Sequence, residues 1–169
     1  MKVLLVIWLF SAGIGVSYSV ISERKKRIEF LRTMEQDLKK LAYYMCEWRL
    51  PVEEAVGRMI KEGSRFVFFY EAIHKRIRER VTDDFGKLWC EESKSLLTGV
   101  TLSEEIKILW KDTFSHIPME PEAVKRQLYL KSEILSEKRK ALEEKYKGEQ
   151  RLVLSMGFFV SAFLCLILW

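Results

Sequence analysis

The sequence predicts an all-α fold: a membrane-anchored bundle of about six helices, flanked by an N-terminal and a C-terminal transmembrane helix. Two uncharged apolar runs occupy residues 3–21 and 152–169 of the 169-residue chain. Between them, apolar residues recur at spacings of three and four, the period of a helix with one buried stripe, and no strand pattern is found. These observations define three segments: a transmembrane helix at 1–22, a cytoplasmic helical bundle at 23–150 and a second transmembrane helix at 151–169.

Each apolar run has the length of a membrane span. A helix rises about 1.5 Å per residue, so roughly 20 residues cross a hydrocarbon core about 30 Å thick. Trp8 and Trp169 are placed to anchor the two helices at membrane interfaces. The first run could instead be a cleaved signal peptide, but the segment from Tyr18 to Ile21 lacks the small residues of a cleavage site. We therefore expect the first run to remain as an anchor.

Basic residues lie on the inner side of both runs. Arg24, Lys25, Lys26 and Arg27 follow the first run directly, and Arg151 ends a lysine-rich stretch before the second. Short basic flanks of membrane spans stay in the cytoplasm. We therefore expect a cytoplasmic bundle and two external termini.

The middle of the chain predicts five amphipathic helices and the start of a long one. The apolar residues that define the five helices run over 28–48, 52–60, 66–81, 85–97 and 102–117. The last helix begins at Pro121 and continues to Leu168 if Gly148 does not interrupt it. Since nothing breaks the chain between Ile21 and Ile28, the first span is expected to run straight into the first helix of the bundle.

Proline, glycine and capping residues mark the helix ends. Pro51 ends the first helix, because proline disfavours helical geometry in the residue before it, and it suits the first turn of the second. Gly63 is the expected C-terminal cap of the second helix, and the segment Thr82-Asp83-Asp84 supplies capping oxygens for the fourth. Thr101, followed three residues later by Glu104, predicts a capping box at the start of the fifth.

The long last helix keeps only a narrow apolar stripe before the second span. Leu128, Leu135 and Leu142 recur every seven residues among many charges. Such a stripe fits either packing against the first helix or a coiled-coil seam between subunits of a homo-oligomer. The spacing does not decide between these two arrangements.

The sequence contains no recognisable catalytic, cofactor or metal site. Its two histidines, His74 and His116, have no Cys, His or carboxylate at metal-ligand spacing. Asp83 and Asp84 form an acidic pair at a helix start, where capping is favoured over acid–base catalysis. We therefore predict that the protein is not an enzyme and holds no cofactor or metal.

Composition and charge pattern also argue against a disulfide framework and against nucleic-acid binding. In a cytoplasmic domain, Cys46 and Cys90 are expected to be reduced core thiols. Basic residues alternate with acidic ones along the helices and cluster only beside the apolar runs, and no nucleic-acid reading element is recognisable. The lipid bilayer is the partner that this charge pattern predicts.

One face of the third helix is a possible partner surface. Phe68 lies off the apolar stripe of that helix, so we expect it at the surface. Arg76, Arg78 and Arg80 lie on or beside the wet face of the same helix. The tryptophans of the middle segment, in contrast, are expected mostly in the core; they are Trp48, Trp89 and Trp110.

Two segments carry a resemblance to a known family. The first is the basic segment Ser22-Glu23-Arg24-Lys25-Lys26-Arg27 after the first span, and the second is the helical-hairpin motif Leu50-Pro51-Val52-Glu53-Glu54-Ala55-Val56. In their order along the chain, with an apolar run at each end, they resemble the stage III sporulation protein AB family. The chain departs from that family at Trp110 to His116, where the family usually shows glycines.

The resemblance implies a function that composition and spacing do not. The family is similar to the cytoplasmic domains of the F-type platform proteins of type II secretion and type IV pilus machines. It implies a non-enzymatic platform subunit of the channel between mother cell and forespore in endospore-forming bacteria. The implied partners are a cytoplasmic ATPase and other membrane subunits of the same complex.

Two other function classes stay open. A pore subunit would line a channel with its spans, but these spans carry no charge, and the small residues Ser11, Gly13 and Gly15 suit helix packing in lipid instead. A membrane-bound enzyme or adaptor of another kind would need convergent polar groups that the sequence does not reveal. A scaffold is therefore the favoured interpretation.

Overall fold

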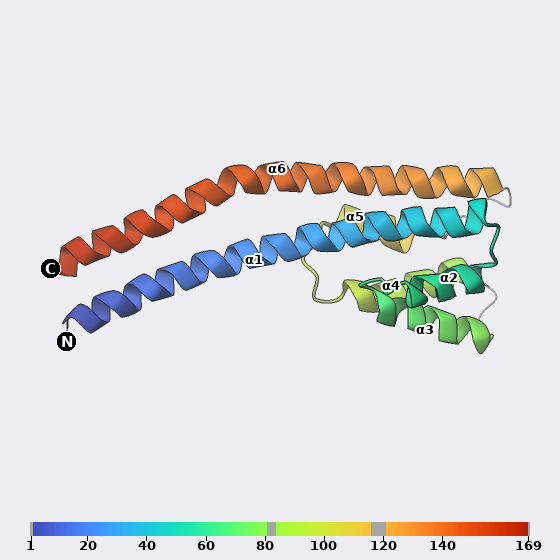
Figure 1. Ribbon diagram of the computed structural model, residues 1–169, viewed down its shortest axis with the longest axis horizontal. Helices are drawn as coiled ribbons and strands as arrows, with labels where there is room; N and C mark the ends of the chain where they lie inside the picture. Colours follow the sequence, from blue (N-terminus) through green and yellow to red (C-terminus); the bar gives the residue numbers. More distant parts are fainter. Residues whose placement is uncertain (1, 81–83, 116–120, 169) are drawn as a thin grey trace. The chain divides into compact units, whose positions relative to one another are not determined.

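The structure is a computed structural model that describes the backbone of residues 2–80, 84–115 and 121–168, and the side chains of residues 19–80, 84–115, 122–149, 155, 156 and 159. All elements in the described residues are helices, which confirms the all-α prediction. In chain order they are α1 (Lys2–Ala42), the π-helix η1 (Tyr43–Glu47), α2 (Val52–Lys61), α3 (Val67–Arg78), α4 (Phe85–Leu97), α5 (Glu104–Lys111) and α6 (Pro121–Leu168), shown in Figure 1.

The chain forms two compact units. One consists of residues 1–29 and 139–169, and the other of residues 30–138. Each of the two long helices, α1 and α6, contributes residues to both units. Within the part of the chain that the structure describes, no helix combines the length and the apolar character needed to cross a membrane. The side chains of Trp8, Arg151 and Trp169 lie outside the described residues.

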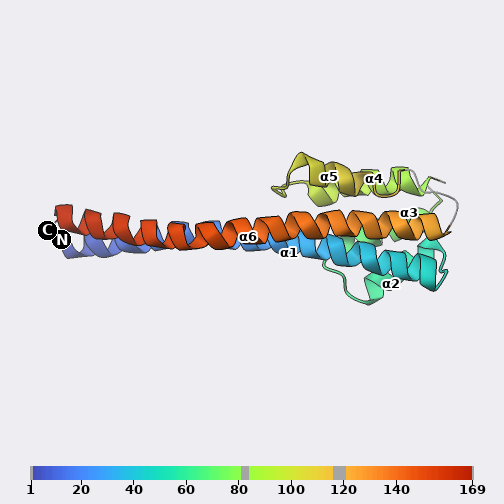
Figure 2. The same ribbon diagram turned by 90° about the horizontal axis from the view of Figure 1, so that it is seen from above.

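In the unit of residues 30–138, one core is built from α1 and α6. The apolar stripe expected over residues 28–48 is buried in its middle, at Leu31, Met34, Leu38 and Leu41, whereas Ile28 and Met45 are half-buried. Leu128 and Leu135 of α6 are also buried within the chain, and Figures 1 and 2 both show this part of α6 alongside α1. The first two leucines of the narrow stripe therefore pack inside the single chain, so they do not need a second subunit for burial.

A second part of the same core is aromatic and joins α3, α4 and α5. The ring of Trp89 lies 4.9 Å from that of Phe69, 5.0 Å from that of Trp110 and 4.6 Å from that of Phe114, measured between centroids. Trp89 Nε1 also donates a hydrogen bond to the backbone oxygen of Trp110 at 2.8 Å. Trp89 and Trp110 are thus core residues as expected, whereas the Trp48 side chain is 46% exposed.

Helix ends follow the sequence prediction in part. Asp84 is the N-cap of α4, and its Oδ1 accepts a hydrogen bond from the backbone N–H of Lys87 at 3.1 Å. Gly63, just after α2, has the left-handed φ of 69° that favours glycine. The predicted capping box at Thr101 is wrong, because the N-cap of α5 is Ser103, two residues later. The reason is local: the backbone N–H of Leu102 bonds to Val100 O at 3.0 Å, which keeps that segment outside the helix.

The ends of three expected helices also differ from the prediction. The regular part of the first helix stops at Ala42 and widens into η1, so it does not reach Trp48 as an α-helix. The helix α3 ends at Arg78 and α5 at Lys111, earlier than the apolar pattern indicated. Residues 81–83 and 116–120, including Asp83 and His116, lie outside the described residues.

Candidate functional site

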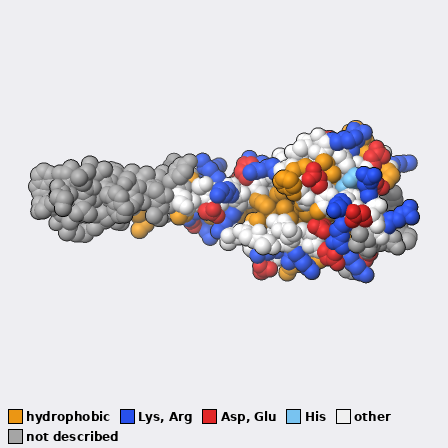
Figure 3. Space-filling model, turned by 90° about the horizontal axis from the view of Figure 1, so that it is seen from below, with side chains coloured by type: hydrophobic (Ala, Val, Ile, Leu, Met, Phe, Trp, Pro, Cys, Tyr) orange, Lys and Arg blue, Asp and Glu red, His pale blue; other side chains and the backbone are white. Residues whose placement is uncertain are grey.

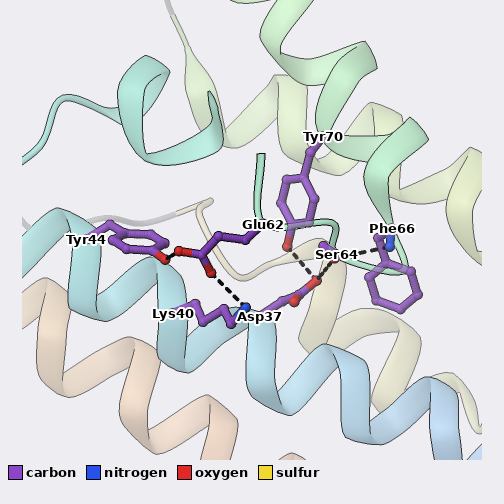
Figure 4. A network of polar contacts seen from close by, with 7 residues as sticks. All are labelled: Asp37, Lys40, Tyr44, Glu62, Ser64, Phe66 and Tyr70. Atoms are coloured by element: carbon purple, nitrogen blue, oxygen red, sulfur yellow. Dashed lines mark hydrogen bonds and ion pairs between the residues drawn. The ribbon is translucent and has the colours of Figure 1, made fainter. Parts of the chain in front are cut away.

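A buried polar network holds the α2–α3 hairpin on α1. Asp37 lies in the core stripe of α1 and is 3% exposed. Its Oδ2 accepts hydrogen bonds from Ser64 Oγ at 2.7 Å and from Tyr70 Oη at 3.0 Å (Figure 4). Ser64 Oγ in turn accepts a hydrogen bond from the backbone N–H of Phe66 at 3.1 Å. One carboxylate thus fixes both the loop before α3 and the α3 helix itself.

A second branch of the network binds the end of α2. The Glu62 carboxylate, just after α2, accepts a hydrogen bond from Lys40 Nζ at 2.9 Å and another from the hydroxyl of Tyr44 (Figure 4). These two bonds lower the pKa of Glu62, the Tyr44 hydrogen bond contributing most. Lys40 belongs to α1 and Tyr44 to η1, so the π-helical turn takes part in holding the hairpin.

Burial governs the protonation of Asp37. Desolvation raises the pKa of this carboxyl to about 6, although the hydrogen bonds from Ser64 and Tyr70 and the charge of Lys40 act in the opposite direction. Burial also raises the pKa of Tyr70. The buried Asp37 carboxyl, bonded to the hydroxyls of Ser64 and Tyr70, therefore holds the hairpin on α1, and we call these three residues the Asp37 clamp.

The hairpin that this clamp fixes carries a groove between α2 and α3. One cavity of about 740 Å³ is lined by Pro51, Glu53, Glu54, Gly57, Arg58, Ile60, Lys61, Glu71 and His74. A second, of about 420 Å³, shares Ile60, Glu71 and His74 and extends along α3 to Lys75, Arg78 and Glu79. We call the two together the α2–α3 groove. Figure 3 shows a face on which apolar side chains lie among acidic and basic ones, the same mixture that lines this groove.

The helical-hairpin motif supplies one wall of the α2–α3 groove. Pro51 and Glu53 line the groove, whereas Ala55 is fully buried beneath it. Leu50 and Val52 are half-buried. Pro51 stands at the N-cap of α2, where its backbone oxygen accepts from the N–H of Ala55 at 2.9 Å. The motif therefore both starts α2 and shapes the surface beside it.

The residues predicted as a partner surface separate into two groups. Phe68 is 82% exposed, and because it precedes Glu71 by three and Lys75 by seven residues, it lies on the same side of α3 as the groove. Arg78 lines the groove, and Arg80 is exposed just beyond α3. Arg76 is half-buried and engaged in ion pairs with α4 instead.

Two glutamates of α4 hold Arg76. Its Nη1 donates to Glu92 Oε1 at 2.9 Å and its Nη2 to Glu91 Oε2 at 2.8 Å. These bonds raise the pKa of the Arg76 guanidinium. Arg76 thus ties α3 to α4, and the exposed candidates for a partner surface are Phe68, Arg78 and Arg80.

One aromatic residue that was expected in the core is exposed beside the groove. The Trp48 ring packs in a tilted arrangement against the Tyr43 ring at a centroid distance of 5.4 Å, and the guanidinium of Arg58, a groove residue, lies 5.1 Å from the Trp48 ring centroid. Trp48 occupies an apolar stripe position in the sequence, so periodicity predicted it in the core. The widening of the helix at η1 changes the helical register and leaves Trp48 half exposed.

Other chemically active residues are dispersed. Among the residues that the structure describes, no three His, Cys, Asp or Glu side chains lie together where they could hold a metal ion. Cys46 and Cys90 are free and half-buried. Desolvation raises the pKa of Cys46.

Comparisons with known proteins give one match. Residues 2–169 match the family described as stage III sporulation protein AB. No curated protein and no solved structure matches the chain.

Proposed function

Because the chain belongs to the stage III sporulation protein AB family, with a role in sporulation, we propose that it is a membrane platform subunit of a secretion-like channel between mother cell and forespore. In this proposal the protein catalyses nothing and holds partners in place. It is needed for endospore formation because the channel cannot assemble on the membrane without it.

The membrane anchors are proposed from the sequence. Residues 3–21 and 152–169 carry no charge, and basic residues follow the first run and precede the second. The helices α1 and α6 include these runs and continue without a break into the bundle. We propose that both runs cross the mother-cell membrane around the forespore, with the bundle in the cytoplasm and both termini outside.

The proposed partners are a cytoplasmic ATPase and the other membrane subunits of the complex. The observation that supports docking is the α2–α3 groove beside the exposed ring of Phe68, on a hairpin fixed by the Asp37 clamp. A large exposed aromatic side chain next to a groove with both charge signs is typical of an interface centre with a polar rim. Because the clamp holds the hairpin in place, less conformational entropy is lost when a partner binds to it.

The docking face is tested by capture of the ATPase from sporulating cells with full-length protein. Phe68→Ser and Arg78→Glu should each reduce capture by about tenfold, the size of one interface hot spot. The matched controls are Ile108→Ser, an exposed apolar residue of α5, and Lys94→Glu, an exposed lysine of α4 outside the groove. If all four variants captured as much ATPase as the wild type, the docking face would lie elsewhere. If the wild type itself captured no ATPase, this partner would be rejected.

A further inference from the structure

A small cavity lies between α1 and α6 in the unit formed by residues 1–29 and 139–169. Its volume is about 170 Å³. The residues that line it are Ile21, Arg24, Lys25 and Ile28 from α1, and Glu143, Tyr146 and Lys147 from α6. It thus combines two apolar residues, one aromatic ring, three cations and one carboxylate around a single space.

Arg24 has a hydrogen-bond donor that is buried and unused. Its Nη2 pairs with Glu149 Oε2 at 2.9 Å, and its guanidinium carbon lies 4.9 Å from the centroid of the Tyr146 ring. These contacts fix the plane of the guanidinium. Its Nη1, however, is buried and has no hydrogen-bond partner among the described residues. A buried charged donor without a partner is costly, so an oxygen anion in the cavity would stabilise it.

The charges around the cavity favour an anion. The one carboxylate that lines it, Glu143, already accepts a hydrogen bond from Arg139 Nη1 at 2.7 Å. The Glu149 carboxylate pairs with only one of the two Arg24 terminal nitrogens in the described contacts. The ammonium groups of Lys25 and Lys147 add two further positive charges to the lining.

The position of the cavity identifies the source of the anion. Ile21, which lines it, is also the last residue of the first apolar run. If that run crosses the membrane as proposed above, the cavity lies at the level of the lipid headgroups on the cytoplasmic side. Its volume is below the roughly 300–1,000 Å³ of pockets for drug-sized ligands, so it suits one headgroup-sized anion.

We propose that the cavity between α1 and α6 binds the phosphate of an anionic phospholipid headgroup, with Arg24 Nη1 as its main donor and Ile21, on the membrane side of Arg24, against the glycerol and acyl carbons. This site rests on the proposed membrane anchoring and deepens it. A lipid bound between the two helices fixes their pairing where they leave the bilayer, and it makes assembly of the platform depend on lipid composition.

The test is native mass spectrometry of the full-length protein in detergent, titrated with phosphatidylglycerol or with phosphatidylcholine of the same acyl chains. The wild-type protein should bind phosphatidylglycerol about tenfold more tightly than phosphatidylcholine. The Arg24→Gln and Lys147→Gln variants should each lose most of this preference. Lys26→Gln is the matched control, because it removes the same charge from the same segment and Lys26 does not line the cavity. Its preference should remain. Circular dichroism of each variant checks that the helices are intact.

Each contrary result has a separate meaning. Equal loss of preference in Lys26→Gln would show general attraction to the basic segment and overturn the site. Displacement of bound phosphatidylglycerol by millimolar inorganic phosphate would show that a free anion, and not a lipid, is the ligand. Release of the wild-type protein from membranes by alkaline carbonate would reject the anchoring proposal itself, whereas retention in the membrane without lipid preference would reject this site alone.

Discussion

The hydroxyl of Tyr70 on α3 donates a hydrogen bond to the carboxylate of Asp37 on α1 at 3.0 Å, and both side chains are almost completely buried. A buried acid in a helix stripe of leucine and methionine needs such partners, because a bare carboxylate would be strongly destabilising in an apolar core. Ser64 supplies the second hydrogen bond, at 2.7 Å. This contact sets the position of the hairpin that carries the α2–α3 groove.

Asp37 should make the stability of the bundle depend on pH. Burial raises its pKa in the folded state from 3.8 to about 6, so the folded protein holds this proton more tightly than the unfolded chain does. The contribution of Asp37 to stability is therefore fully present below about pH 4 and is lost as the pH rises through about 6. Compared with Asp37→Asn, which stays neutral, the wild type should lose up to about 3 kcal/mol of unfolding free energy between pH 4 and 7.

Urea unfolding of residues 28–149 across this pH range measures the difference. We expect this fragment to fold without the apolar runs into a mostly helical bundle. Glu62→Gln is the control of opposite sign, because the pKa of Glu62 is lowered and its stabilising contribution is lost as the pH falls. A wild type and an Asp37→Asn variant with parallel pH profiles would show that Asp37 does not titrate in this range.

Gly86 is the glycine whose replacement should cost the most stability among those described. A Cβ at this position would lie 2.3 Å from Phe114 O and 3.0 Å from Phe114 C, which are backbone atoms that cannot rotate away. Gly86→Ala should therefore destabilise the bundle by about 2 to 3 kcal/mol. At Gly57 in α2 the nearest atom would be His74 Nε2 at 3.7 Å, so Gly57→Ala should be neutral or up to about 1 kcal/mol more stable in urea unfolding. Equal effects of the two substitutions would contradict the close contact of α4 with Phe114.

The N-cap residues of α4 and α5, Asp84 and Ser103, should contribute differently to the free energy of unfolding. Asp84 accepts a hydrogen bond from the N–H of Lys87, so Asp84→Ala should cost about 1 kcal/mol of unfolding free energy. Ser103 makes no side-chain capping bond, and Ser103→Ala should stay within about 0.5 kcal/mol of wild type. A larger loss at Ser103 than at Asp84, measured by thermal or urea unfolding, would mean that the caps are assigned incorrectly.

Single alanine substitutions of the residues most able to do acid–base chemistry should leave sporulation largely intact. These residues are His116, Asp83 and Asp84; His74 is left out because it lines the α2–α3 groove. A platform depends on its surface and anchors, and loss of one cap costs at most about 2 kcal/mol. The readout is the frequency of heat-resistant spores. A variant that folds, still captures its partner and yet forms no spores would indicate catalysis.

The helices and the main core stripe were predictable because their signals are local. Leu31, Met34, Leu38 and Leu41 follow the helical period in the sequence, and the same residues are buried in the structure. Phe68 breaks that period on α3 and is exposed, as predicted. The burial of Asp37, three residues after Met34, was not predicted, because its partners come from the distant α2–α3 hairpin and have no local signal.

The features that were not predictable depend on contacts between distant or competing groups. The widening into η1 is accompanied by a hydrogen bond from the N–H of Leu50 to Tyr44 O at 3.0 Å, made only after the chain turns through Arg49 with a φ of 52°. The choice of Ser103 over Thr101 as a cap depends on a backbone turn between them, which the capping-box spacing does not reveal. The cavity beside Arg24 joins residues from opposite ends of the chain, and the sequence showed these only as two basic flanks.

Spore formation by a strain that lacks the chromosomal gene and carries either the full-length protein or residues 23–150 alone tests the anchored platform most directly. Circular dichroism first establishes that the shorter protein is helical and folded. We predict that the full-length protein restores heat-resistant spores and that the folded domain alone does not, because a platform must be attached to the membrane to hold its partners there. Restoration of spores by the domain alone would contradict the platform function.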